Sequence, residues 1–407
     1  MKKLLSILCA AVLLATLVIT CVSCGGSSVS ADFKVGAILI GDENEGYTYA
    51  HINGIRTAAK ELGMSDDQII WKYTVPEDEK CYDAAIDLVE QGCSVIFSNS
   101  YGHQSHMKQA AQECPDVTFV AMTGDQAATS GLSNYKNAFT GVYQSRYVAG
   151  VVAGMKLAEL VADGKLTDAN YDGDNIKLGY VGAYPYAEVV SGFTAYYLGV
   201  KSVVENVTMQ VTYTNSWFDI TAEGTVAEAL AADGCVIISQ HADSTGAPAA
   251  VQALQDKGQV IYCVGYNVDM LSVAPNAALT SPTNTWAVYY KYAMETAANG
   301  GTIDTNWAKG YEADAVGITA LGSACAAGTQ EKVDEVVKGL TDGSIKVFDT
   351  SKFTVGGTTL TEYLADVDGD FAPDTNAIWD GYFHESEMRS APYFDIRIDG
   401  IVENNNN

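Results

Sequence analysis

The chain has 407 residues, of which 48% are hydrophobic and 18% charged, so it is long enough for two hydrophobic cores and too apolar for a disordered protein. Aspartate and glutamate number 50 against 23 lysines and arginines, which gives a formal net charge of -27. A field of this sign repels nucleic acid and anionic lipid, so nucleic acid is excluded as a partner and the charge mainly favours solubility.

The first segment of the chain has the layout of an export signal. Two lysines precede an almost wholly apolar stretch that ends at Val22. Cys24 follows a small residue and precedes a Gly/Ser linker, which resembles a bacterial lipoprotein box. We therefore expect residues 1–23 to be a signal peptide and residues 24–32 a linker, with lipid on Cys24 holding the protein to the extracytoplasmic face of the cell membrane. Secretion with cleavage nearby and a membrane-spanning helix are the alternatives.

From Phe33 onward, short apolar runs alternate with longer amphipathic stretches, a rhythm typical of parallel strands joined by crossover helices. Continuous apolar runs such as Val95-Ile96-Phe97 indicate a parallel sheet that is covered on both faces. In this first unit we expect strands at 33–40, 69–74, 93–98, 117–122 and 138–141, and helices at 49–62, 77–91, 103–114 and 147–160.

The same rhythm begins again at Ile176, after a polar interruption at 163–175. Here we expect strands at 177–182, 207–213, 236–239 and 260–264, and helices at 189–202, 221–232 and 248–257. The repetition predicts an α/β fold with two doubly wound, Rossmann-like lobes.

Further elements follow the second unit: a helix at 286–299, segments at 316–327 and 331–340, and a final strand and tail. These leftover elements indicate that the chain crosses between the lobes more than once, which makes a hinge. We assign residues 33–143 and about 268–308 to the N-terminal lobe, residues 144–267 and about 309–390 to the C-terminal lobe, and residues 391–407 to a tail.

Open parallel sheets bind ligands at the carboxyl ends of their strands, so the residues after each strand are expected to line a cleft between the lobes. These loops are rich in aromatic and carboxamide side chains and contain almost no lysine or arginine. The candidate ligand-binding residues are Tyr47, Tyr49, Asn99, Tyr101, Asp125, Tyr184, Glu188, Trp217, Phe218, His241, Asp243, Asn267 and Asp269. Such a set suits a flat, neutral heterocycle that stacks on rings and is hydrogen-bonded at its edge. A phosphate would need basic residues, whereas sugars also stack on aromatic rings and remain a competing ligand class.

Two short motifs point to metal, and both are incomplete. His103 and His106 have no nearby cysteine or glutamate ligand. Asp366–Asp370 resembles a calcium loop but lacks the Gly and Glu that an EF-hand has at positions six and twelve, so a solvated acidic turn is the favoured interpretation. The sequence contains no nucleophile elbow, zinc-protease, Walker or dinucleotide motif. We therefore expect no catalysis, metal or cofactor.

Several of the loops together resemble one known family. The motifs are Gly46-Tyr47-Thr48-Tyr49-Ala50-His51, Ser191-Gly192-Phe193, Asn215-Ser216-Trp217-Phe218-Asp219, Gln240-His241-Ala242-Asp243-Ser244, Gly265-Tyr266-Asn267-Val268-Asp269-Met270 and Leu279-Thr280-Ser281. With the lipoprotein box, they resemble the basic membrane lipoprotein family, the substrate-binding proteins of purine-type ABC importers. The resemblance covers most of the mature chain and implies a type I periplasmic binding protein fold, a purine ligand, and ABC permease and ATPase partners.

Two branches of that family differ in their ligand. In the nucleoside branch, a Val-Asp-x-Asp-Gln motif and a lysine after Leu-Thr-Ser hold the ribose, but here Asn267 replaces the first Asp and that lysine is missing. The other motifs are similar to the free-nucleobase branch, which implies that Trp217 stacks on the base and Asp243 pairs with its nitrogens. Tyr47 and Gln144 depart from that branch as well. We therefore favour an adenine-like base over a nucleoside.

The sequence thus predicts a monomeric, lipid-anchored receptor that captures a purine base or nucleoside between its lobes and delivers it to a permease. The alternatives are a ligand-sensing lipoprotein that signals to a membrane partner, a sugar-binding importer component, and an exported nucleosidase that recruits Asp42, Glu43 and Asp125.

Overall fold

The computed structural model describes residues 29–404 of the chain. The expected signal peptide at 1–23 and the expected lipid site at Cys24 lie outside the described residues. Within residues 29–404, no helix combines the length and the apolar character that a bilayer crossing requires.

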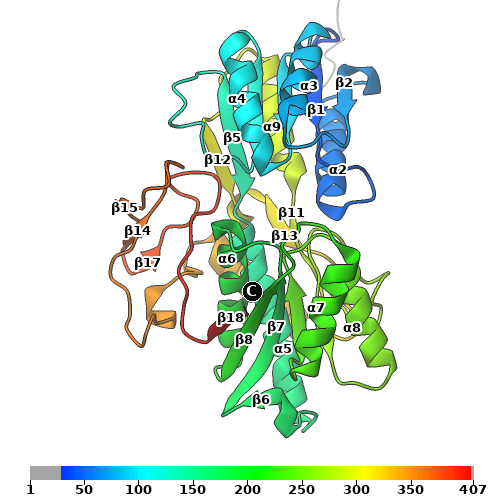
Figure 1. The fold of residues 1–407 in the computed structure, drawn as a ribbon, viewed down its shortest axis with the longest axis vertical. Coiled ribbons are helices and arrows are strands. Elements are labelled where there is room, and N and C mark those ends of the chain that lie inside the picture. The colour runs from blue at the N-terminus through cyan, green and yellow to red at the C-terminus, as the bar shows by residue number, and fades with distance from the viewer. Residues whose placement is uncertain (1–28, 405–407) are drawn as a thin grey trace, which may run out of the picture.

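The upper lobe in Figure 1 is built on a sheet of parallel strands in the order β12-β5-β4-β3-β1-β2. The strands are β1 (Val35–Ile38), β2 (Ile69–Lys72), β3 (Val95–Ser98), β4 (Thr118–Met122), β5 (Tyr135–Thr140) and β12 (Asn306–Lys309), and the helices are α2 (Gly46–Glu61), α3 (Glu79–Glu90), α4 (Gln104–Glu113) and α9 (Trp286–Ala298). Because side chains alternate along a strand, Phe97 packs in one cluster with α2 and α9, and Ile96 packs in another with α3 and α4. The predicted coverage of both faces is confirmed.

The lower lobe repeats this design around a sheet with the order β10-β9-β7-β8-β18. Its strands are β6 (Tyr171–Asp172), β7 (Asn175–Gly182), β8 (Val207–Tyr213), β9 (Ile237–Gln240), β10 (Tyr262–Val264) and β18 (Ile401–Asn404), and its helices are α5 (Val142–Ala162), α6 (Ala187–Lys201), α7 (Ile220–Ala232) and α8 (Gly246–Asp256). The predicted pair of doubly wound lobes is therefore confirmed.

The chain passes between the lobes after β5, through β11 (Pro282–Asn284) and through β13 (Val316–Ile318), which leads on to α10 (Thr329–Thr341). β11 and β13 pair antiparallel and form a small sheet between the lobes. The boundary expected near residue 268 differs from the structure, because Met270 and Ala278 pack in a cluster with α7 and α8 of the lower lobe.

The C-terminal segment lies along the side of the molecule and reaches both lobes (Figure 1). It contains β14 (Leu364–Ala365), β15 (Thr375–Asn376), β16 (Ile378–Trp379) and β17 (Tyr382–Phe383) before β18. The prediction of a tail at 391–407 was wrong, because Ile401–Asn404 pairs parallel with β8 at the edge of the lower sheet. A strand of four residues with mixed polarity carries no periodic signal that would identify it.

Helices α5 and α6 make an unusually close contact in the lower lobe. A Cβ on Gly150 would overlap the carbonyl oxygen of Tyr196, and a Cβ on Gly199 would overlap that of Tyr147. The two glycines therefore allow the helix backbones to touch.

We expect Gly150→Ala to lower the free energy of unfolding by about 1 to 3 kcal/mol, because the added methyl forces the helices apart. Gly317→Ala in β13 is the matched control, since a Cβ there would meet no atom within 4 Å. Denaturant unfolding of both variants tests this expectation, and equal midpoints would contradict it.

Candidate ligand-binding site

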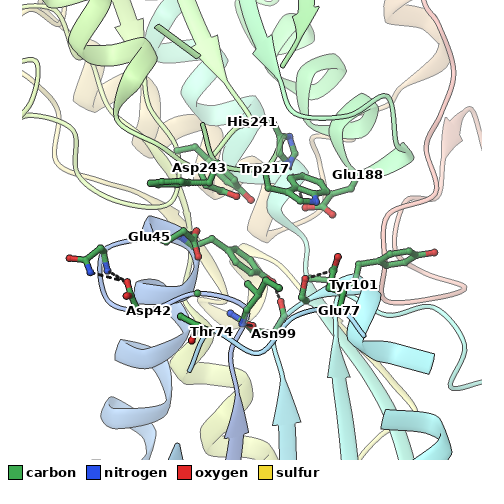
Figure 2. Close-up of a pocket in the computed structure, with 18 residues that line it drawn as sticks. Asp42, Glu45, Thr74, Glu77, Asn99, Tyr101, Glu188, Trp217, His241 and Asp243 are labelled. Carbon is green, nitrogen blue, oxygen red and sulfur yellow. Dashed lines mark hydrogen bonds and ion pairs between the residues drawn. The ribbon is translucent and has the colours of Figure 1, made fainter. Parts of the chain in front are cut away.

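A cavity of about 400 Å³ lies between the two lobes (Figure 2). The upper lobe lines it with Ile40, Gly41, Asp42, Asn44, Glu45, Tyr47, Thr74, Glu77, Asn99, Ser100, Tyr101 and Thr123, and the lower lobe with Glu188, Trp217, Phe218, His241, Asp243 and Tyr266. All of these residues follow the carboxyl ends of strands, from β1 to β4 in one lobe and from β7 to β10 in the other. The cavity therefore lies where two facing open sheets are expected to bind a ligand.

The structure brings most of the predicted site residues together on this wall. Tyr47, Asn99, Tyr101, Glu188, Trp217, Phe218, His241 and Asp243 line the cavity. Tyr49, Asp125, Tyr184, Asn267 and Asp269 do not, so a direct ligand contact by these five stays a prediction.

The five residues outside the wall fall into two groups. Three of them contact residues of the wall: Asn267 donates to Asp243, Asp125 accepts from Tyr101, and the Tyr184 ring lies edge-on to Trp217. Tyr49 is 41% exposed on α2, and Asp269 accepts a hydrogen bond from the Leu271 amide within its own loop.

Aromatic rings reach the cavity from both lobes. Tyr47 and Tyr101 belong to the upper lobe, whereas Trp217, Phe218 and Tyr266 belong to the lower lobe. The Tyr47 hydroxyl donates to the carbonyl oxygen of Asn99 at 2.5 Å, which fixes that ring, while Phe218 is 40% exposed at the edge. A flat ligand between the lobes would meet ring faces or edges on both sides, and each base stacked on an aromatic side chain is worth about 1 to 3 kcal/mol.

Asp243 is a buried polar group of the wall whose orientation is set by a chain of hydrogen bonds. Its Oδ1 accepts from Nδ2 of Asn267 at 2.7 Å, and Oδ1 of Asn267 accepts from Nδ2 of Asn284 at 3.2 Å. The Thr140 hydroxyl, at the end of β5, in turn donates to Asn284. Burial raises the pKa of Asp243 well above its ordinary value, and the neighbouring Glu45 adds to the shift. A hydrogen-bond chain thus runs from the hinge to a buried carboxyl that faces the cavity.

Glu188 and His241 form a second polar pair, with Oε1 and Nε2 3.4 Å apart. Burial raises the pKa of Glu188 to about 7 and lowers the pKa of His241 well below its ordinary value. The imidazole is therefore neutral at neutral pH, and the pair can donate to a ligand or accept from it without a fixed charge.

Arg146 lies directly behind this wall and was missed by the strand-end reasoning, because it comes from the interior of α5. Its guanidinium carbon lies 3.7 Å from the centre of the Tyr266 ring, and its Nη1 donates to the carbonyl oxygen of Gln240 at 2.5 Å. Its charge opposes the upward shifts in the pKa of Glu188 and Asp243. The described residues that line the cavity themselves include no lysine or arginine.

The raised pKa of Glu188 predicts a pH dependence of stability. The folded chain holds this proton up to about pH 7, whereas the unfolded chain releases it near 4.5, so the free energy of unfolding falls as the pH rises through this window. Glu188→Gln removes this contribution and should be more stable than the parent by about 1 to 3 kcal/mol at pH 8, with little difference at pH 4.5.

Denaturant unfolding across this pH range measures the difference between variant and parent. Glu385, whose pKa burial also raises to about 7, contributes equally to both chains. Glu228→Gln on the exposed face of α7 is the control and should follow the parent curve; a constant difference for Glu188→Gln would refute the assignment.

Two residues of the cavity wall have a strained, left-handed backbone, and so does a residue beside the wall. Thr74 and Thr123 line it with φ angles of 53° and 64°, and Asn267 has a φ of 62°. A left-handed backbone is costly for β-branched residues and tends to occur at functional sites. Neither threonine was among the candidate ligand-binding residues, because threonine carries no sequence signal for this conformation.

Two sequence motifs that point to metal lie outside the cavity wall. Nε2 of His103 is 2.9 Å from the carbonyl oxygen of Val75, so this imidazole is held within the lobe. Carboxyl oxygens of Asp366, Asp368 and Asp370 lie within 4.8 Å of one another, an arrangement that is common for exposed acidic groups without an ion.

Comparisons with known proteins agree with this architecture. The family model Bmp, described as ABC transporter substrate-binding protein PnrA-like, matches residues 40–349. A purine-binding protein of Brucella abortus is 32% identical over 267 residues, which are 65% of this chain and 69% of that protein. A Haloferax volcanii protein, provisionally named as an ABC transporter glucose-binding protein, is 28% identical over 68% of this chain and 64% of its own length. The solved structure of an ABC transporter solute-binding protein from Aeropyrum pernix has a TM-score of 0.63 at 16% identity and covers 78% of this chain and 93% of that one.

Proposed function

Because this chain belongs to the family of PnrA-like ABC transporter substrate-binding proteins, we propose that it captures a purine base in the cavity between its lobes and delivers it to an ABC permease. The observation that carries the proposal is the wall itself, to which both lobes contribute aromatic rings and carboxyl groups. The family is one of substrate-binding proteins, so we expect the ligand to leave the cavity chemically unchanged.

The polar groups of the wall suit the edge of a purine. Ring and exocyclic N–H groups need acceptors, which Asp243 and Glu188 supply, and Trp217 offers a ring face for stacking. A cavity of about 400 Å³ is at the small end of the range for ligand sites, which favours a base over a larger ligand. The purine-binding Brucella relative supports the same ligand class.

Attachment to the membrane remains part of the proposal. Lipid on Cys24 would leave the two lobes on the extracytoplasmic face, within reach of a permease and its ATPase. The mass of the N-terminal peptide tests this directly, since an unmodified Cys24 would contradict it.

Calorimetry with adenine, guanine, hypoxanthine, xanthine and their nucleosides tests the ligand. We expect at least one free base to bind in the micromolar range or tighter, and more tightly than its nucleoside. Glucose belongs in the same panel because of the Haloferax relative. Binding of glucose with no binding of any purine would overturn the proposal in favour of a sugar receptor.

A further inference from the structure

The segment at 350–404 lies beyond the part of the chain that the family model matches, and it is anchored in the lower lobe. Phe353 and Phe394 lie in the same apolar cluster as the strands and helices of that lobe, and Phe394 stacks on Phe348 with ring centres 4.1 Å apart. β18 then pairs with β8. The segment therefore moves with the lower lobe.

The side-chain hydrogen bonds and ion pair that it makes with the upper lobe are polar contacts. Nη1 of Arg389 lies 3.7 Å from Oδ2 of Asp125, and the Ser390 hydroxyl is 3.3 Å from Oδ1 of Asn306 in β12. The Thr129 hydroxyl is 3.4 Å from the carbonyl oxygen of Asp368. Water can replace the two hydroxyl contacts at small net cost when the lobes separate, whereas an apolar seam would resist separation.

Arg389 is held in place for its contact with Asp125. Its Nε and Nη2 donate to the carbonyl oxygens of Ala391 and Pro392 at 3.2 and 3.1 Å, which leaves Nη1 directed toward Asp125 and, at 4.0 Å, Asp366. The side chains of Arg389 and Asp125 are only 9% and 8% exposed. Separating such a pair without water access leaves a buried charge unpaired, which is costly.

The same carboxylate connects Arg389 to the ligand cavity. Oδ2 of Asp125 also accepts from the hydroxyl of Tyr101 at 3.0 Å, and Tyr101 lines the cavity. A side chain anchored in the lower lobe therefore reaches a cavity residue of the upper lobe through one carboxylate.

We propose that residues 350–404 form a clasp between the lobes, and that Arg389 is a positioning residue that holds Asp125 and Tyr101 in the ligand-bearing arrangement. The clasp favours the closed lobes by contacts outside the cavity. A ligand that binds the closed form gains apparent affinity from any such bias. The part of the proposal that concerns lobe closure is argued from the structure alone. The part that concerns ligand affinity rests on the proposed function.

The test compares Arg389→Met and Asp125→Asn with Arg397→Met as the matched control. Arg397 belongs to the same segment, but its Nε pairs with Glu403 at 2.7 Å within the lower lobe. Small-angle scattering without ligand should show a larger radius of gyration for Arg389→Met and Asp125→Asn, and the parent value for Arg397→Met. Release of whichever purine binds should become about fivefold faster or more in the first two variants.

A double variant distinguishes loss of the Arg389–Asp125 ion pair from a general destabilisation of the protein. Arg389→Met combined with Asp125→Asn should release ligand no faster than Asp125→Asn alone, because the pair is already broken. Arg389→Lys keeps the charge and should recover part of the parent behaviour; it also serves if Arg389→Met does not fold.

The clasp fails if folded Arg389→Met keeps the parent radius of gyration and release rate, or if the two substitutions act additively. If no purine binds, the scattering comparison still decides the clasp, and only the proposed ligand is lost. If every variant binds and releases purines like the parent, the proposed function is supported and the clasp is refuted.

Discussion

Asp243→Asn is expected to weaken purine binding by about 100-fold, which corresponds to about 2.7 kcal/mol. Oδ1 of Asp243 accepts from Asn267, so in the variant the amide oxygen would take that position and its NH₂ group would face the cavity. A fixed donor would then oppose the N–H groups of the base, whereas the carboxyl of the parent can present an acceptor there, because a donor on the ligand favours its ionised form. Calorimetry with the best-binding purine measures the loss.

Asp269→Asn is the matched control for this change. Asp269 lies in the neighbouring loop and accepts from the Leu271 amide, but it does not line the cavity. The affinity of this variant should stay within about twofold of the parent, since the changed side chain lies outside the cavity wall. Equal affinities of the Asp243 and Asp269 variants would show that Asp243 does not contact the ligand.

Trp217→Ala is expected to weaken binding by about 10- to 100-fold, in line with about 1 to 3 kcal/mol for one stacked base. Trp217 is the largest ring of the lower wall, and its contacts with Tyr184 and Tyr186 hold it at the cavity edge. The loss should be similar for all purines, because every base offers a π-face.

Trp71→Ala makes the same chemical change away from the cavity. Trp71 lies on β2 and stacks on Tyr73, with ring centres 5.8 Å apart. We expect this variant to bind like the parent once both are shown to be folded by circular dichroism. If the Trp217 variant binds purines with unchanged affinity, the ligand does not stack on this ring.

The strand-end rule predicted both walls of the cavity because it depends only on sheet topology. The rule was less accurate in identifying which residues of a loop line the cavity. Tyr49 is two residues from Tyr47, about 200° further around the helix, and therefore faces solvent while Tyr47 faces the cavity. Helical periodicity, applied to the first turn of α2, would have separated the two. Tyr266, which lines the wall, was passed over for Asn267 and Asp269.

Other features have no local signal in the sequence. Arg146 contributes from the interior of a helix, and its role depends on which residues the fold packs against it. β18 pairs with a strand nearly two hundred residues earlier, and Arg389 meets Asp125 across an even longer span of the chain. Isolated long-range contacts of this kind leave no periodic pattern, so only the folded chain reveals them.

The hydrogen-bond chain from Thr140 through Asn284 and Asn267 to Asp243 links four separate segments, two of which adjoin the hinge. When the lobes part, β5 and β11 change their relation to the lower lobe, and the carboxyl that would hold the base loses its outermost support. In the proposed transport role, opening of the lobes would therefore both expose the ligand and weaken its binding. Release to the permease would then require no further conformational change.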